Sequence, residues 1–268
     1  MTFMAKFKDV VRDTLPRPAL IAAKQILHAG SGADCVVCGA SVRHFLPQGH
    51  DYPVLRELDV VGGQRKEADE CPICHANDRV RLVYLYIRTR TALLSGPSRL
   101  LHLAPELGLA DVFMAAPELD YVPADLDRQR YRHLPDLITF DLQDAPLADA
   151  SFDWIICNHV LEHIPDDRKA MREICRLLKP GGAAILQVPL AQALDKTVED
   201  ITLTDEAERI RRFGQRDHVR LYGPDYYGRL REAGLDVTLW DAFHEEPALA
   251  AAWNLNPRER LTIARRPL

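Results

Sequence analysis

The sequence predicts an α/β protein in which a doubly wound, mainly parallel sheet of seven strands follows a small N-terminal zinc-knuckle domain. From residue 96 onward, short apolar segments alternate with segments of helical periodicity, as in parallel sheets that carry helices on both faces. Several of the apolar segments end in a polar residue, which is typical of strands with a ligand site at their carboxyl ends. Two Cys-x2-Cys pairs upstream predict the zinc knuckle.

Changes in composition divide the chain into an N-terminal helical segment (1–30), a zinc-binding knuckle with the helix that follows it (31–95), and the α/β domain (96–268). Residues 3–28 have apolar side chains at helical spacing, interrupted by prolines within 15–18, which predicts a surface helix. Residues 31–75 contain many turn formers and little periodicity. The segment 76–94 should be helical and end at the Ser-Gly-Pro turn that opens the main domain.

Each element of the α/β domain follows from its local pattern. Strands are predicted where short apolar runs are bounded by turn formers, at 99–103, 120–124, 137–140, 153–157, 183–188, 235–240 and 260–265. Helices are predicted where apolar residues recur at helical spacing, at 106–116, 166–178 and 224–233. A Lys-Pro-Gly-Gly stretch at 179–182 stops the second of these helices before the next strand.

The bulk composition is that of a soluble globular protein, with 47% hydrophobic and 27% charged residues. The net charge of −5 gives no electrostatic reason to expect a nucleic-acid partner. The segment 31–90 is also balanced, with eight basic and eight acidic residues. No apolar run approaches the ~20 residues that span a bilayer, and the first 20 residues lack the apolar h-region of a signal peptide. We therefore expect a cytoplasmic protein without a membrane partner.

The two cysteine pairs have the spacing of a zinc site. Cys35 and Cys38 form one pair, Cys71 and Cys74 the other, and 32 residues separate them. Each Cys-x2-Cys brings two thiolates to one side of a tight turn, so two turns supply the tetrahedral set that zinc prefers. Four protein ligands leave no open position, so the predicted Zn²⁺ is structural. Buried free thiols and a redox pair are the alternatives.

Three stretches of the α/β domain carry a family resemblance. They read YVPADLD from residue 121, ITFDLQDAPLADASFDWIICNHVLEHIPD from 138 and MREICRLLKPGGAAILQVP from 171. Over roughly 98–268 the chain resembles a class I S-adenosylmethionine-dependent methyltransferase of the type 11 group. The resemblance implies a Rossmann-like sheet, S-adenosylmethionine as the methyl donor, and cofactor residues at the carboxyl ends of four strands.

At the end of the first strand, the resemblance implies an acidic residue followed by glycines. This chain has His102 at the acidic position, then Ala104, Pro105 and Glu106, and only Gly108 remains of the glycines. Pro105 suits the first position of a helix, and Glu106 suits its positive N-terminus. We expect Ala104, Glu106 and Gly108 to line the cofactor site, with Glu106 accepting from the ammonium of the methionine moiety. A capping glutamate without a ligand is the alternative.

Two further strand ends are predicted to hold the adenosine. Asp125 lies about 20 residues after the first loop, a spacing at which a carboxylate accepts from both ribose hydroxyls. Its neighbour Leu126 belongs to the same predicted site, and Asp127 is the competing carboxylate. The resemblance implies that Asp141 reaches the adenine amino group and that Leu142 covers the ring.

The fourth strand end and the long segment after the fifth strand complete the predicted site. The resemblance places the backbone of Cys157 and Asn158 against the methionine portion and His159 near the methyl group or the acceptor. Residues 189–223 are long and polar, and such loops are usually functional or disordered. We expect this segment to cover the site, with His218 as a general base and Arg220 as a clamp for an anionic acceptor.

Three hypotheses for function follow. The first is a methyltransferase, with a structural zinc knuckle, that acts on an O or N atom of a small molecule or a modified peptide. The second is a binding or scaffold protein that has lost the cofactor along with the glycines. The third is an RNA methyltransferase with a zinc reader. Calorimetry with S-adenosylmethionine separates the first two, and retention on RNA at physiological salt separates the third.

Overall fold

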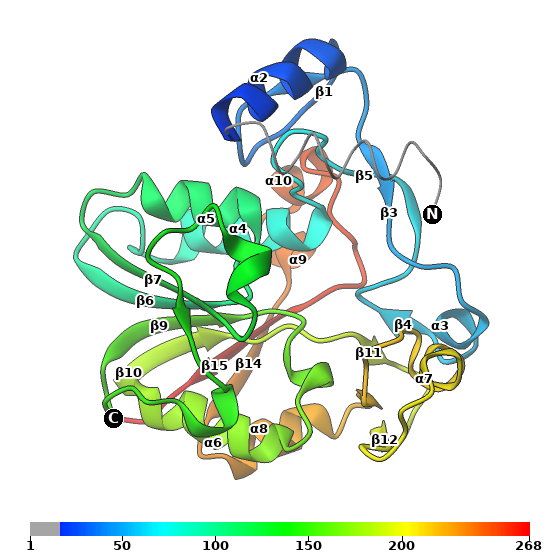
Figure 1. Cartoon of the computed structure of the whole chain (residues 1–268), viewed down its shortest axis with the longest axis vertical. Coiled ribbons are helices and arrows are strands. Elements are labelled where there is room, and N and C mark those ends of the chain that lie inside the picture. The colour runs from blue at the N-terminus through cyan, green and yellow to red at the C-terminus, as the bar shows by residue number, and fades with distance from the viewer. Residues whose placement is uncertain (1–16) are drawn as a thin grey trace.

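A computed structural model describes residues 17–268, so the part of the predicted N-terminal helix before Arg17 lies outside the described residues (Figure 1). The remainder of that helix is α2 (Arg17–His28), which begins next to the two prolines. Its Ile26 and Leu27 are exposed, whereas Arg17 pairs with Asp111 of the main domain. None of the helices in 17–268 combines the length and apolar character needed to cross a bilayer.

A seven-stranded sheet forms the centre of the molecule, as predicted. Its order is β14-β15-β10-β9-β6-β7-β8 (Figure 1). The strands are β6 (Ser98–Leu103), β7 (Leu119–Asp125), β8 (Ile138–Thr139), β9 (Phe152–Cys157), β10 (Leu178–Ile185), β14 (Asp236–Trp240) and β15 (Leu261–Arg265). Only β15 runs against its two neighbours. The strand order reverses between β6 and β9, and this switch point is where open α/β sheets bind ligands.

Helices cover both faces of the sheet. On one face lie α4 (Asp78–Arg90) and α5 (Leu107–Met114), and on the other α6 (Asp167–Leu177) and α8 (Tyr226–Glu232) (Figure 1). Successive strand residues point to opposite faces. Accordingly Leu100 packs in the core beneath α4 and α5, and Leu101 packs in the core beneath α6 and α8. Both faces are therefore buried, which explains the nearly continuous apolar strands.

Two element boundaries differ most from the predictions. The helix predicted over 76–94 ends at Arg90, because Thr91 is in an extended conformation. The strand predicted over 183–188 begins at Leu178, so that Lys-Pro-Gly-Gly lies within β10. Pairing with β9 is interrupted between Leu178 and Ala183, which is how the strand accommodates a proline and two glycines.

The N-terminal region consists of short strands and one short helix: β1 (Ala29–Asp34), β2 (Ser41–Val42), β3 (Leu46–Gln48), α3 (Pro53–Glu57), β4 (Val60–Val61) and β5 (Lys66–Glu70). β1 pairs with β2, and β3 pairs with β5. The apolar side chains of the N-terminal region do not form a separate core. Val37 and Ile73 belong to the same buried cluster as Leu109 and Phe113 of α5. The knuckle is thus continuous with one face of the sheet.

The segment after β10 folds onto the N-terminal region. It contains β11 (Leu190–Ala191), β12 (Val198–Glu199), α7 (Glu206–Phe213) and β13 (Arg220–Leu221). β11 pairs with β4, and Leu55 of α3 shares a small core with Phe213 of α7. Two segments far apart in sequence therefore form one layer beside the sheet (Figure 1). The C-terminal helices α9 (Ala242–Glu245) and α10 (Pro247–Ala252) precede β15.

Candidate active site

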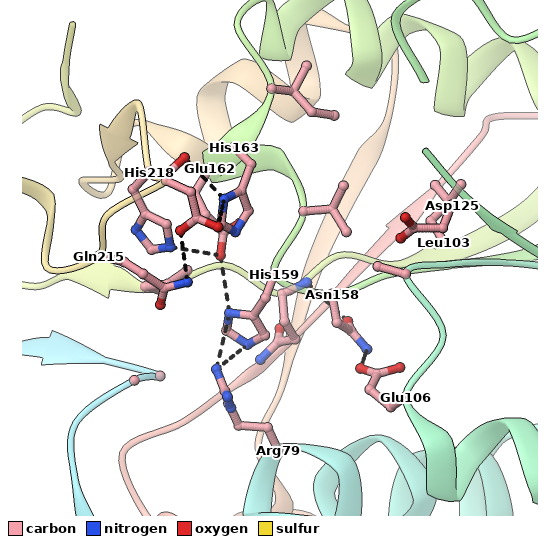
Figure 2. A pocket seen from close by; sticks show the side chains of 18 of the residues that line it. Arg79, Leu103, Glu106, Asp125, Asn158, His159, Glu162, His163, Gln215 and His218 are labelled. Carbon is pink, nitrogen blue, oxygen red and sulfur yellow. Dashed lines mark hydrogen bonds and ion pairs between the residues drawn. The ribbon is translucent and has the colours of Figure 1, made fainter. Parts of the chain in front are cut away.

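A cavity of about 930 Å³ lies at the carboxyl ends of β6, β7 and β9, at the switch point. Residues at or just after the ends of these strands and of β8 line one side of it: Ala104, Glu106, Asp125, Leu126, Asp141, Leu142, Asn158 and His159. The sequence predicted all eight as site residues. The opposite side is lined by the N-terminal region and by the segment after β10 (Figure 2).

The first loop keeps the backbone of a glycine turn without the glycine. Ala104 has a φ of 48°, in the left-handed region that costs a residue with a Cβ strain energy. Its amide donates to the carbonyl of Ala124 at 2.9 Å, which ties the loop to β7. His159, after β9, has a φ of 55°. Two strained residues thus flank the switch point, where backbone strain is commonly functional.

Glu106 supplies the carboxylate that the resemblance places at position 102. One carboxylate oxygen lies 2.6 Å from Nε2 of the fully buried His102. The other accepts from Nδ2 of Asn158 at 3.0 Å (Figure 2). Burial by itself raises the pKa of Glu106, but these two partners hold it below its usual range. Glu106 is therefore an anion within the cavity. The sequence placed His102 at the acidic position and Glu106 in the cofactor site, but it gave no sign that the two side chains contact each other.

Two expectations for this loop were wrong. α5 begins at Leu107 with Glu106 at its N-cap, so Pro105 precedes the helix and does not open it. Gly108 does not line the cavity. A Cβ on Gly108 would lie 3.3 Å from the Sγ and carbonyl oxygen of Cys74 and 3.2 Å from Val37. The glycine lets α5 approach the cysteine knuckle closely and does not serve the cofactor site.

The two carboxylates at the end of β7 have different environments. Asp125 lines the cavity and accepts the amide of Asp127 at 2.7 Å. Asp127 instead caps the 3₁₀ turn η1 (Arg128–Tyr131) by accepting the amide of Gln129 at 2.9 Å. Leu126 is 71% exposed and presents its apolar side chain at the rim of the cavity. Asp125 is thus better placed than Asp127 for a ligand.

The end of β8 is organised in the same way. Asp141 accepts the amide of Gln143 at 2.9 Å at the start of the 3₁₀ turn η2 (Leu142–Asp144). Leu142 is buried beneath it. Cys157, at the end of β9, is fully buried in the core under α6 and its side chain does not reach the cavity. The side chain of Cys157 therefore packs in the core, and the expectation that its backbone faces the cofactor stays a prediction.

A cluster of ionisable groups lines the part of the cavity around His159 and Glu162. His159 is 3.3 Å from Oε1 of Glu162 through Nδ1 and 2.8 Å from a guanidinium nitrogen of Arg79 through Nε2 (Figure 2). Burial and the Arg79 charge lower the pKa of His159 below its usual value. Glu162 is 1% exposed. Burial opposes its ionisation, but His159, His163 and His218 lower its pKa to about 2.

Of the two site residues predicted on the covering segment, His218 lines the cavity and Arg220 does not. His218 is 4% exposed, lines the cavity, and has its pKa lowered to about 4 by burial. Arg220 is 1% exposed and does not line the cavity. Its guanidinium donates to the carbonyl oxygens of Leu161 and Pro165, each at 2.8 Å, and to that of Ile164. The predicted clamp for an anionic acceptor is wrong, because this cation stabilises the turn η3 (Leu161–His163) and its surroundings.

The N-terminal region and the start of α4 contribute a wall of the cavity that sequence reasoning missed. Its lining residues are Gln48, Gly49, His50, Leu55, Gly62, Gly63, Asn77, Arg79, Val80 and Val83. Asn77 caps α4 by accepting the amide of Val80 at 3.0 Å, which directs the first turn of that helix toward the cavity. The Gly62-Gly63 pair was visible in the sequence, but only as a turn. Arg79 carried no sequence signal.

The four cysteines form two matching turns. The carbonyl of Cys35 accepts the amide of Gly39, and that of Cys71 accepts the amide of His75. Gly39 and His75 both have positive φ, at 73° and 62°. The Sγ atoms lie within 4.8 Å of one another, with pairs at 3.6 and 3.9 Å. Tetrahedral zinc with bonds of about 2.3 Å needs sulfur separations of about 3.8 Å, so the cluster fits the metal.

Comparisons with known proteins agree with this architecture. Residues 96–186 match the family model Methyltransf_11, described as a methyltransferase domain. The chain is 44% identical over 119 residues to the methyltransferase GfsG of Streptomyces halstedii, covering 41% of this chain and 39% of that protein. It is 31% identical over 135 residues to a ubiquinone biosynthesis O-methyltransferase of Xanthomonas oryzae pv. oryzae, covering 45% and 55%. The chain thus spans 39% and 55% of the length of these two curated relatives.

Among solved structures, the chain is similar to the YcgJ protein of Bacillus subtilis. The two share 17% sequence identity with a TM-score of 0.46, and the match covers 70% of this chain and 99% of YcgJ.

Proposed function

We propose that this chain, which carries a class I S-adenosylmethionine-dependent methyltransferase domain over residues 96–186, methylates an O or N atom of a small molecule or modified peptide. The observation that carries the proposal is the convergence of Glu106, Asp125 and Asn158 on one cavity at the switch point. The relatives that it matches include proteins named as O-methyltransferases, such as the Xanthomonas one. The acceptor class is the part that the proposal adds.

The residues present suit the parts of S-adenosylmethionine. Asp125 would accept from the two ribose hydroxyls, and Asp141 from the adenine amino group. Leu126 has exposed apolar surface and Leu142 lines the same cavity, so the two would cover the adenine ring. Glu106 is an anion and would accept from the ammonium of the methionine moiety. The strained Ala104 would let the loop backbone approach the cofactor, as a glycine does.

The acceptor site would lie between Arg79, His159 and His218, at the interface of the N-terminal region and the segment after β10. S-adenosylmethionine supplies an activated methyl group on a positively charged sulfur. In the transfer, the acceptor lone pair forms a bond to the methyl carbon, the carbon–sulfur bond breaks, and its electron pair stays on sulfur. His159 would take the acceptor proton on Nε2 in exchange for its contact with Arg79, since its lowered pKa keeps it neutral. Alignment of the acceptor with the methyl carbon and sulfur, together with exclusion of water, accounts for the rest of the rate enhancement.

The four cysteines would hold a structural Zn²⁺ that positions α5. Gly108 brings this helix against Cys74, and Glu106 stands at its N-cap. The metal would therefore determine where the cofactor-binding carboxylate lies without touching the cofactor. Thiolate ligands of this kind fit a reducing compartment, and we place the protein in the cytoplasm.

Binding of S-adenosylhomocysteine tests the cofactor assignment without knowledge of the acceptor. Asp125→Ala should weaken binding by tenfold to hundredfold, because loss of a carboxylate that serves two hydroxyls costs about 1.5–3 kcal/mol. Asp127→Ala is the matched control, since its side chain caps η1 and faces away from the cavity lining. Titration calorimetry of both variants and the parent checks this. If the parent does not bind S-adenosylhomocysteine, the scaffold function is favoured. If only Asp127→Ala loses affinity, Asp127 and not Asp125 is the ribose-binding carboxylate.

His159→Gln should reduce kcat by roughly 10²–10⁴ with the methyl acceptor, the range expected for loss of a general base. The binding of S-adenosylhomocysteine should be nearly unchanged, since the ring contacts Arg79 and Glu162 and not the predicted ribose or adenine residues. Steady-state kinetics beside calorimetry makes the test. A rate close to that of the parent would assign His159 to packing, and a parallel loss of cofactor affinity would move it to the cofactor side.

A further inference from the structure

Glu162 is a buried carboxylate whose charge is not satisfied by hydrogen bonds. Its side chain is 1% exposed, and neither Oε1 nor Oε2 has a hydrogen-bond partner in the part of the chain that the structure describes. The nearest imidazole nitrogens are Nδ1 of His159 at 3.3 Å and Nε2 of His218 at 4.0 Å. An ionised carboxylate buried without donors is costly. A cation beside it would remove that cost.

Two histidines next to Glu162 have the orientation of metal ligands. Nδ1 of His218 lies 3.3 Å from the carbonyl oxygen of Phe213, and Nδ1 of His163 lies 3.2 Å from that of Asp217. Donation from Nδ1 to a carbonyl leaves the lone pair on Nε2, as in most metal-binding histidines. The two rings meet edge to face with centroids 4.7 Å apart. One ligand atom from each of Glu162, His163 and His218 lies within 4.8 Å of the other two.

We propose that Glu162, His163 and His218 bind a divalent transition-metal ion in the acceptor half of the cavity. Two histidines and a glutamate form the ligand set of catalytic zinc sites, in which three protein ligands leave a position open. All three residues line the cavity, so the open position faces it (Figure 2). The cysteine cluster is a different kind of site, because four thiolates leave no position for another ligand.

The role of this site rests on the proposed function. In that role, the site specifies the acceptor as an oxygen nucleophile. A metal ion held by these residues would act as a Lewis acid, so that an acceptor hydroxyl beside it would lose its proton more readily. His159, which lies beside Glu162, would take that proton. The acceptor oxygen would then form the bond to the methyl carbon as the carbon–sulfur bond breaks, with the electron pair of that bond staying on sulfur. The predicted acceptor class is therefore a hydroxyl compound, and the reaction is O-methylation.

Zinc stoichiometry of the full chain tests the site without any methyl acceptor. Competition with a chromophoric chelator should show two zinc ions per chain in the parent and one in Glu162→Gln and His218→Gln, whose second site weakens by more than about a hundredfold. His50→Gln is the matched control, because this histidine also lines the cavity but stands outside the cluster. It should keep two zinc ions.

The outcomes separate the metal site from the proposed function. A parent with a single zinc that depends on the cysteines overturns the metal site, as does a second zinc that survives both Glu162→Gln and His218→Gln. Calorimetry with S-adenosylhomocysteine on the same samples shows that the variants are folded. If the variants fail to fold, the stoichiometry of the parent alone decides. A parent that binds two zinc ions but no S-adenosylhomocysteine would support the metal site and contradict the methyltransferase function.

Discussion

Cys71→Ser is expected to release the structural zinc and to cause the largest loss of stability among the substitutions considered. Cys71 and two of the other three cysteines lie in the same buried cluster as Leu109 and Phe113 of α5. Structural zinc contributes about 10–16 kcal/mol of binding free energy in small zinc domains. Since the N-terminal region has no core of its own, loss of one ligand should lower the free energy of unfolding by several kcal/mol.

The same substitution should also weaken cofactor binding, because α5 packs through Gly108 on the knuckle and presents Glu106 to the cavity. Cys175→Ser is the matched control. Cys175 is a partly exposed thiol outside the cluster, and its replacement should leave zinc content and melting temperature near those of the parent. Metal analysis and thermal unfolding with and without chelator make the measurement. If the parent protein contains no zinc and its thermal stability is the same with and without chelator, the prediction of a structural zinc is contradicted.

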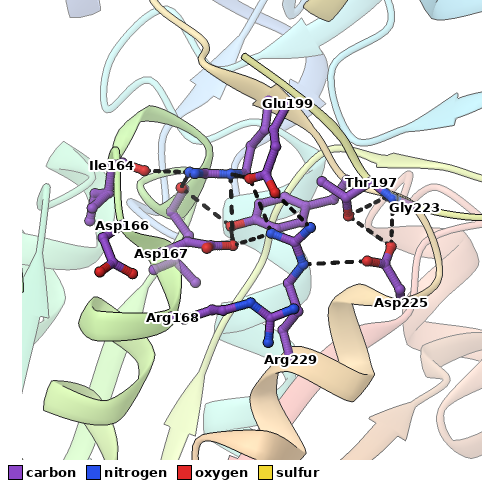
Figure 3. A network of polar contacts seen from close by, with 12 residues as sticks. Ile164, Asp166, Asp167, Arg168, Thr197, Glu199, Gly223, Asp225 and Arg229 are labelled. Atoms are coloured by element: carbon purple, nitrogen blue, oxygen red, sulfur yellow. Dashed lines mark hydrogen bonds and ion pairs between the residues drawn. The ribbon is translucent and has the colours of Figure 1, made fainter. Parts of the chain in front are cut away.

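Arg220→Met is expected to lower the free energy of unfolding by about 3–5 kcal/mol, the cost of breaking a buried ion-pair network. Figure 3 shows this network, in which Asp167 accepts from Arg229 at 2.9 Å and from the hydroxyl of Tyr222 at 2.7 Å. Arg220 lies 3.7 Å from Asp167 and donates to Glu199 at 3.1 Å. Removing it also leaves the carbonyl groups around η3 without their donor.

The control for this variant is Arg216→Met, an exposed arginine on the same segment, which should change stability by less than about 0.5 kcal/mol. Urea unfolding of both variants gives the free energies. S-adenosylhomocysteine affinity of the folded Arg220→Met should match that of the parent, since Arg220 does not line the cavity. A stable Arg220→Met with a raised KM for the acceptor would instead restore Arg220 to the acceptor site.

The order of elements was accessible from the sequence, because local rules determine it. Apolar runs bounded by turn formers marked all seven strands of the sheet, and the strand ends marked the residues that line one side of the cavity. Parallel strands bring their carboxyl ends to one edge, so Asp125 and Asn158 could be placed together without coordinates. The repeated Cys-x2-Cys spacing likewise brought four thiolates together, since each pair needs only a local turn.

Long-range packing decided the rest. The pairing of β4 with β11 joins residues about 130 positions apart and turns the N-terminal region into a wall of the cavity, which no local pattern encodes. An arginine near aromatic and acidic neighbours has the same sequence signature whether it lines a cavity, as Arg79 does, or is buried among carbonyl oxygens, as Arg220 is. Gly108 shows the same limit. Its small size was evident from the sequence, but only the tertiary structure shows that the surface it approaches is the cysteine knuckle.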